Sequence, residues 1–147
     1  MAVTASGIWH PDPGDAYSNV ANLATMAESI EDAVGPYVSD TGWVDCTVMP
    51  GHSVQSSRPV QVRRIGPRVQ MRWGISNLGL SANTTSDIIQ LPPGFYPALN
   101  CYLPAIGHIG TAMAMIHISP STGKIDIRTG PTLGSYYILD AASWLVN

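Results

Sequence analysis

The segment Val69-Gln70-Met71-Arg72-Trp73-Gly74-Ile75 decides the fold class of this 147-residue chain. Its apolar residues recur at every second position, and polar residues stand between most of them. Because successive side chains of a strand point to opposite faces, this period of two predicts a strand with one face in a core. The side chains of Arg68, Gln70 and Arg72 are expected on the opposite, solvent-facing side.

Segments with the same period lie on both sides of this strand. Toward the N-terminus, strands are expected over 44–48 and from residue 60 onward, followed by a turn at Gly66-Pro67. Toward the C-terminus, a loop rich in Ser, Asn, Thr and Gly covers 76–87, and the turn Ser121-Thr122-Gly123 joins two strands into a hairpin. The later strands are expected at about 86–91, 98–104, 111–118, 123–129 and 135–146. Many short strands separated by turns predict a mostly β fold, a β-sandwich or jelly roll.

The same alternation predicts which side chains form the core. The segment Leu91-Pro92-Pro93-Gly94-Phe95-Tyr96-Pro97 interrupts it, because its prolines cannot occupy a central strand and instead form a rigid corner with an aromatic anchor. The expected core residues are Val44, Val62, Val69, Met71, Trp73, Ile88, Leu91, Met115, Ile125 and Ile138.

Residues 1–40 form a separate N-terminal part, ahead of a β-domain over 41–147. Two prolines and a glycine within 9–14 predict an extended arm, and Asp15 or Ser18 can then cap a helix that ends at Gly35-Pro36. This helix carries an apolar seam at heptad spacing, formed by Val20, Leu23, Ala27, Ile30 and Val34. The seam predicts either a short coiled coil between subunits or an amphipathic helix packed on its own β-domain.

Composition favours self-association. Only 12% of residues are charged, about half the usual fraction, so subunit burial would relieve a poorly charged surface. The net charge of −3 is uneven: residues 1–57 hold seven acids and no Lys or Arg, whereas 58–147 hold three acids and seven bases. Such asymmetry indicates either different partners for the two parts or a merely solvated acidic helix. Neither a signal peptide nor a membrane span is expected.

No residue pattern typical of a catalytic or metal site is present in the sequence. The four histidines, at 10, 52, 108 and 117, lack metal-ligand spacing, and the three acids after residue 45 are far apart in sequence. Cys46 and Cys101 lie in apolar segments without a Cys-x-x-Cys motif, so each is expected to be a buried small hydrophobe, and whether they pair is open. We therefore expect no enzyme activity, no cofactor and no metal.

Five arginines, Arg58, Arg63, Arg64, Arg68 and Arg72, gather around the first predicted hairpin. A basic cluster can bind nucleic acid, but the chain is acidic overall and has a single lysine. We expect no nucleic-acid binding, and we expect the arginines to cover a polar sheet face or to pair with acidic helices of other chains.

Residues 42–147 resemble a domain found at the C-terminal ends of tail fibre and minor tail (receptor-binding) proteins of tailed bacteriophages. The helical segment 27–33, Ala-Glu-Ser-Ile-Glu-Asp-Ala, resembles the short segment that often precedes such domains. The likeness rests on an ordered set of short phrases, which are Gly42-Trp43, Val62-Arg63-Arg64-Ile65-Gly66, Val69 to Gly74, Leu91 to Pro97, Gly123 to Ile127 and Ser143 to Val146.

This resemblance implies a virion tail protein, assembled in the host cytoplasm, whose homotrimeric β-sandwich head binds a host cell-surface carbohydrate for attachment. Because no shaft precedes the head in this sequence, the first 40 residues are expected to join other virion proteins. The alternatives are a purely structural virion protein, such as a tail-tip assembly or capsid decoration subunit, and a non-viral binding module of the C1q or tumour-necrosis-factor type.

A carbohydrate site would need planar polar side chains for hydroxyl groups and an aromatic ring for the apolar face of a sugar. The loops of the β-domain offer both kinds of side chain. The candidate carbohydrate-binding residues are Asn77, Asn83, Asp87, His108 and Tyr136.

Overall fold

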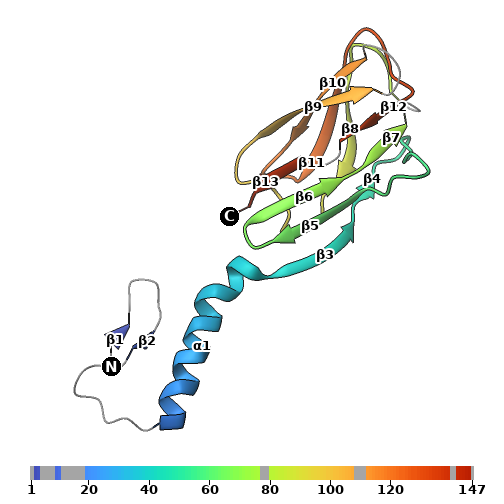
Figure 1. The fold of residues 1–147 in the computed structure, drawn as a ribbon. Coiled ribbons are helices and arrows are strands. Elements are labelled where there is room, and N and C mark those ends of the chain that lie inside the picture. The colour runs from blue at the N-terminus through green and yellow to red at the C-terminus, as the bar shows by residue number, and fades with distance from the viewer. Residues whose placement is uncertain are drawn as a thin grey trace. The chain divides into compact units, whose positions relative to one another are not determined.

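The computed structural model describes residues 2–3, 9–10, 19–76, 80–107, 112–139 and 142–146. The chain divides into two compact units, Met1–Ser39 and Asp40–Asn147, and each is described by itself. The first unit contains the antiparallel strands β1 (Ala2–Val3) and β2 (Trp9–His10) and the helix α1 (Asn19–Val38) (Figure 1). Within the described residues, no helix is long and apolar enough to cross a membrane.

Helix α1 continues through the Gly35-Pro36 pair that the sequence predicted as its end. Proline lacks the N–H that would bond to the carbonyl of Asp32, but this removes a single hydrogen bond of the helix. The next turn closes again, since the backbone N–H of Ser39 donates to the carbonyl of Gly35 at 2.9 Å. The predicted end was therefore wrong, and the helix reaches Val38.

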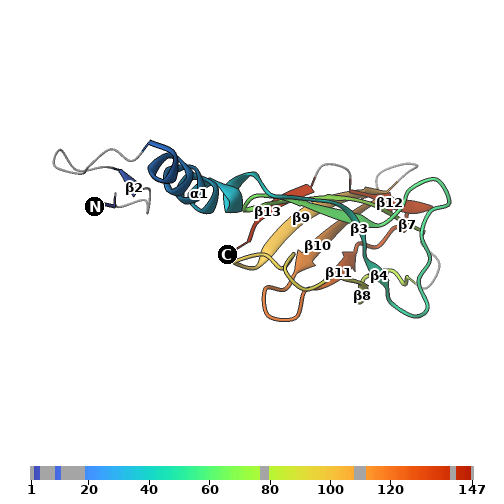
Figure 2. The same cartoon turned by 90° about the horizontal axis from the view of Figure 1, so that it is seen from below.

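The second unit, which we call the head, consists of short strands. Their bounds are β3 (Asp40–Asp45), β4 (Thr47–Val48), β5 (Gln61–Ile65), β6 (Arg68–Arg72), β7 (Gly74–Ser76), β8 (Thr85–Gln90), β9 (Cys101–Gly107), β10 (Met113–Ile118), β11 (Lys124–Thr129), β12 (Tyr136–Ile138) and β13 (Ala142–Leu145). They form a large sheet of order β4-β8-β11-β10-β9-β12-β7 and a small sheet of order β13-β6-β5-β3 (Figures 1 and 2). The predicted mostly β sandwich is confirmed.

Three predicted strands are each divided between the two sheets. The predicted strand 44–48 contributes its first residues to β3 of the small sheet and its last residues to β4 of the large one. The segment 69–75 supplies β6 to the small sheet and β7 to the large one, and the chain crosses between them at Trp73. The predicted strand 135–146 likewise becomes β12 in the large sheet and β13 in the small one. A period of two reports which side chains face the core, but it carries no information about which sheet a segment joins.

The core fills the space between the sheets and matches most of the predicted list. Trp73 is fully buried, and so are the predicted residues Val62, Val69, Met71, Ile88, Leu91 and Ile125. Val44 is half-buried and packs against the core. Met115 was wrongly predicted, because β10 is almost continuously apolar and its inward positions are Ala114, Ile116 and Ile118. Ile138 is half-buried, and its neighbour Tyr137 occupies the core position.

The proline-rich corner 91–97 is anchored by aromatic side chains, as its sequence predicted. Phe95 is buried, and its carbonyl accepts a hydrogen bond from the indole Nε1 of Trp144 at 2.9 Å. The ring of Tyr96 lies against Gly123, where an added Cβ would come within 2.0 Å of the ring. Gly123 also has a φ of +66°, so both its conformation and its missing side chain allow this contact. The corner thereby contacts both β13 of the small sheet, through Trp144, and the turn before β11 of the large sheet, through Gly123.

We expect Trp73→Ala to lower the free energy of unfolding by about 3–5 kcal/mol, because it leaves a cavity between the two sheets. Chemical denaturation of the isolated variant measures this change. Trp73→Phe is the matched control, because it keeps an aromatic ring in the core. It also removes a buried indole N–H that has no acceptor among the described residues. Its free energy of unfolding should therefore fall less than that of Trp73→Ala. A Trp73→Ala variant as stable as the wild type would contradict the central position of this residue.

Candidate functional site

The outward face of the large sheet brings residues from four strands together. Antiparallel register aligns their side chains in rows across β9, β10, β11 and β8. One row consists of Tyr102, His117, Asp126 and Asp87, and the next consists of Pro104, Met115, Arg128 and Thr85. We call this surface the β9–β11 face, defined by Tyr102, Met115, His117, Asp126 and Arg128.

The first row is a connected polar ladder. The His117 ring stacks on the Tyr102 ring with centroids 4.8 Å apart, its Nδ1 lies 2.6 Å from Asp126 Oδ2, and its Nε2 lies 3.1 Å from Asn100 Oδ1. Lys124 Nζ donates to Asp87 Oδ2 at 2.8 Å. Each carboxylate therefore has a basic partner, and the ring of His117 is held through both nitrogens. The arrangement presents the oriented polar groups of His117 and Asp126 beside Tyr102, which is 59% exposed.

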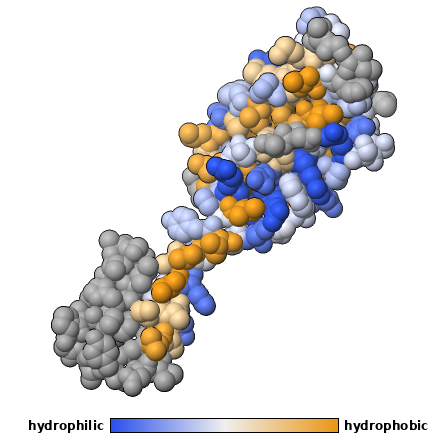
Figure 3. Space-filling view, viewed as in Figure 1, coloured by the Kyte–Doolittle hydropathy of each residue, from blue (hydrophilic) through white to orange (hydrophobic). Residues whose placement is uncertain are grey.

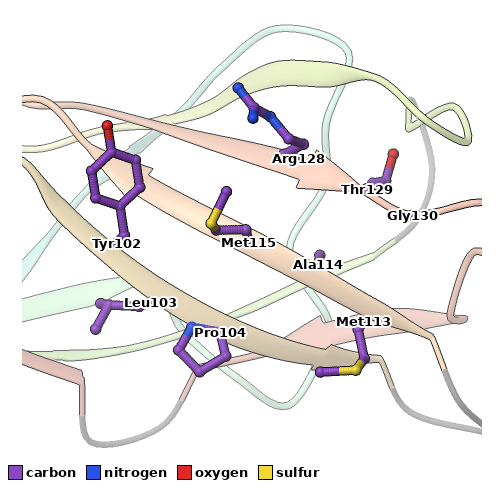
Figure 4. A pocket seen from close by; sticks show the side chains of 9 residues that line it. All are labelled: Tyr102, Leu103, Pro104, Met113, Ala114, Met115, Arg128, Thr129 and Gly130. Carbon is purple, nitrogen blue, oxygen red and sulfur yellow. The ribbon is translucent and has the colours of Figure 1, made fainter.

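Two adjoining depressions lie on this face. The larger has a volume of about 500 Å³ and is lined mainly by apolar groups of β9 and β10, with Arg128 at its margin (Figure 4). The smaller, of about 220 Å³, has three members of the polar ladder, Tyr102, His117 and Asp126, and also Thr85 in its lining. Tyr102, Met115 and Arg128 line both, and Figure 4 shows Met115 between the other two. The face therefore offers an apolar surface next to a polar one.

The structure separates the predicted carbohydrate-binding residues. Asp87 lies in the polar ladder, whereas Tyr136 is on β12, four inter-strand steps or about 19 Å from β8. Asn83 lies in the turn before β8, with a φ of 55°, and its N–H donates to the carbonyl of Gly130 at 3.0 Å. Asn77 and His108 lie outside the described residues. Of the three described residues, Asp87 lies next to the β9–β11 face and Tyr136 lies away from it, and a common site for the five residues stays a prediction.

Sequence reasoning missed the other members of this face. A signal for one pair existed: the predicted hairpin at Ser121-Thr122-Gly123 aligns His117 with Asp126 once its register is counted. Tyr102 and Arg128 had no comparable signal, because their proximity depends on the pairing of β9 with β10 and on which side chains of β11 face outward.

Two of the three acids after residue 45 lie side by side although they are far apart in sequence, and the third, Asp140, lies outside the described residues. Asp87 and Asp126 are direct cross-strand partners on β8 and β11, next to an irregularity in the register. They have different partners: Lys124 forms an ion pair with Asp87, and His117 Nδ1 lies within hydrogen-bond distance of Asp126. Within the described residues, no group of three or more His, Cys, Asp or Glu side chains is arranged to hold a metal ion.

The two cysteines are free thiols packed against the core. Burial and the neighbouring charge of Asp45 raise the pKa of the Cys46 thiol to about 12. Burial also raises the pKa of the Cys101 thiol. Because the thiolate is the nucleophile and metal ligand, both residues behave as small apolar core residues.

Comparison with known proteins identifies the fold. No protein-family model matches the chain, and no curated protein matches its sequence. Among solved structures, the receptor-binding protein of Listeria phage PSA superposes with a TM-score of 0.60 at 20% identity, covering 90% of this chain and 82% of that one. The head domain of phage bIL170, described in connection with the receptor-binding domains of lactococcal phages, superposes with a TM-score of 0.50 at 19% identity, covering 71% and 97%. The resemblance to phage receptor-binding heads that the sequence indicated is confirmed at the level of the fold.

We expect both thiols of the native protein to react slowly with a thiol reagent at pH 8. A thiol with a pKa of about 12 is ionised in roughly one molecule in ten thousand at this pH. Cys101, which is less buried, should react before Cys46. Time-resolved labelling followed by peptide mass spectrometry measures both rates, with the denatured chain as the control. Equal rates in the native and denatured chains would contradict the burial of these residues.

Proposed function

We propose that this protein is the receptor-binding head of a bacteriophage tail and that it binds a carbohydrate of the host-cell envelope. The observation that carries the proposal is the β9–β11 face, which places an exposed tyrosine beside a ladder of oriented polar groups. The fold shared with phage receptor-binding proteins supports the same role. Since one fold serves many functions, the site rather than the fold has to be tested.

The chemistry of the β9–β11 face suits a sugar ring. The exposed Tyr102 ring can contact the C–H face of a pyranose, while Asp126 accepts and Arg128 donates hydrogen bonds to its hydroxyl groups. Asp87, one of the residues proposed from the sequence, extends the polar ladder at one end. Asn83 and Tyr136 lie off this row and are proposed only as contacts to a longer glycan. We propose a binding role without catalysis for the whole face.

Single-site affinity should be weak, because the larger depression is open to solvent. We expect a dissociation constant of about 1 mM, or roughly 4 kcal/mol. Several copies on one particle would then supply the avidity needed for adsorption.

We further propose that the chain is a homotrimer joined through helix α1. The seam residues Leu23, Ile30 and Val34 are 63%, 38% and 41% exposed, and Ala27 is exposed as well. The apolar character of the helix surface is visible in Figure 3. The side chain of Val20 lies outside the described residues. An uncovered heptad seam favours packing against other copies, and the acidic composition of this unit suits a distinct virion partner for attachment.

A structural virion subunit without a receptor is the second candidate. It is favoured by the third row of the large sheet, where Ile106 is 67% and Met113 is 66% exposed. Exposed apolar side chains in a group are typical of protein–protein contacts. On this alternative, the large sheet would face another virion protein instead of the host surface.

Adsorption competition separates the two candidates. Purified protein in excess should block attachment of the phage to host cells, and Asp126→Asn combined with Arg128→Gln should raise the amount needed at least about tenfold, because two charged hydrogen-bonding groups are lost. Arg68→Gln on the small sheet is the control and should compete like the wild type. If the wild-type protein never competes, receptor binding is excluded and the structural role takes its place.

Light scattering tests the proposed trimer. The full chain should have about three times the 15.6 kDa mass of one chain, whereas a chain lacking residues 1–35 should have the mass of a monomer. The truncated chain should also no longer join the virion. Circular dichroism of the truncated chain checks that the head stays folded. A monomeric full chain at micromolar concentration would contradict the trimer, and normal incorporation of the truncated chain would contradict the attachment role.

A further inference from the structure

The larger depression of the β9–β11 face offers a surface that the hydroxyl groups of a sugar cannot use. Its lining includes the side chains of Leu103, Pro104, Met113, Ala114 and Met115, which carry no strong hydrogen-bond donor or acceptor. A hydroxyl group placed against them would exchange water for atoms that offer it no hydrogen bond. An apolar group attached to the sugar would instead gain by leaving water.

This apolar surface begins one row of side chains away from the polar ladder. Residues on the same face of a strand are two positions apart, or about 7 Å. His117 and Met115 are related in this way on β10. Tyr102 and Pro104 are related in the same way on β9. A sugar ring that contacts Tyr102 in the smaller depression can therefore reach the row of Met115 with a substituent only a few bonds long.

Arg128 supplies a hydrogen-bond donor where the two depressions meet. Its side chain lines both of them, and Met115 lies between Pro104 and Arg128 in their row (Figure 4). The Nε of Arg128 donates to Thr85 Oγ1 at 3.3 Å, a contact that involves neither terminal nitrogen of the guanidinium. Both terminal nitrogens carry further N–H donors. A substituent that extends from the smaller depression into the larger one thus passes a charged donor and then reaches apolar side chains.

We propose that the β9–β11 face recognises an acetylated sugar, whose acetyl carbonyl accepts a hydrogen bond from Arg128 and whose acetyl methyl group packs against Met113 and Met115. An acetyl group combines one acceptor oxygen with one methyl group and has the required length. A hydroxyl group lacks the methyl, and the methyl group of a deoxy sugar lacks the carbonyl, so each would use only half of the surface. The acetyl site rests on the carbohydrate role proposed above and specifies the class of sugar.

Met113 and its neighbour Ile106 provide a matched pair for testing this site. They are direct cross-strand partners, and they are 66% and 67% exposed. Met113 lines the larger depression, whereas Ile106 is not among its described lining residues. A polar replacement of either residue removes a similar exposed apolar side chain, but only the replacement of Met113 changes the proposed acetyl site.

The test is an NMR titration of the full chain, labelled with ¹³C in its methionine methyl groups. The ligands are N-acetylglucosamine, N-acetylgalactosamine and 6-O-acetylglucose, each compared with its parent sugar, glucose or galactose. At least one acetylated sugar should bind about fivefold or more tightly than its parent, because it adds an apolar contact and a charged hydrogen bond. The same sugar should shift the methyl resonances of Met113 and Met115 more than its parent does.

Two variants separate the acetyl site from a general effect of exposed apolar side chains. Met113→Gln keeps the length of the side chain and replaces its thioether with an amide, so the preference for the acetylated sugar should fall below about twofold. Ile106→Gln is the control and should keep the full preference. Tighter binding of an N-acetyl sugar would assign the site to an amide, and tighter binding of the O-acetyl sugar would assign it to an ester.

The acetyl site is overturned if no acetylated sugar binds more tightly than its parent. It is also overturned if Met113→Gln keeps the preference, or if Met113→Gln and Ile106→Gln remove it equally. Failure of this site is distinguishable from failure of the carbohydrate role. Successful adsorption competition by the wild-type protein without any acetyl preference would contradict the acetyl site alone, whereas absence of competition would remove both.

Discussion

Burial of the inner faces of the two sheets against each other is the constraint on which the rest of the head depends. The large sheet contributes Ile88, Ile116 and Ile125 to this interior, and the small sheet contributes Val62, Val69 and Met71. Trp73 stands where the chain passes from one sheet to the other and fills the space between them. Because side chains alternate along a regular strand, an inward residue directs its neighbours outward. Strand β8, whose register with β11 is irregular, departs from this rule at Ile88 and Ile89, which are both buried.

The chemistry of the two outer faces follows from this constraint. On the large sheet, the inward positions of Ile116 and Ile118 direct His117 outward, where it meets Tyr102 and Asp126. On the small sheet, the inward positions of Val69 and Met71 direct Arg72 outward beside Gln61. The two faces therefore differ in character: one places an aromatic ring and paired charges beside an apolar depression, and the other carries arginine side chains.

Rigidity is what makes the β9–β11 face a candidate for recognition. The polar ladder and the apolar depression beside it rest on strands in the middle of a seven-stranded sheet. Side chains on such elements lose little conformational entropy on binding, so even an open surface can discriminate between ligands. Exposed loops would offer more varied contacts but less defined geometry. The weak affinity expected for this face is compatible with a particle that presents many copies.

The sequence by itself determined the mostly β class, the N-terminal helix with its heptad seam, and most of the core, because these depend on local periodicity. The burial of Val69, Met71 and Trp73 could be predicted from the alternation of seven residues. Where a strand is almost wholly apolar, as β10 is, the sequence does not show which of its side chains face inward. Met115 was therefore assigned to the wrong face of the sheet. Only the tertiary structure decided that residues 69–75 serve both sheets, that Asp87 lies beside Asp126, and that Met115 lies between Pro104 and Arg128. These facts depend on strand order and on which sheet each segment joins, and both are set by packing between residues far apart in the chain, which a local pattern does not record.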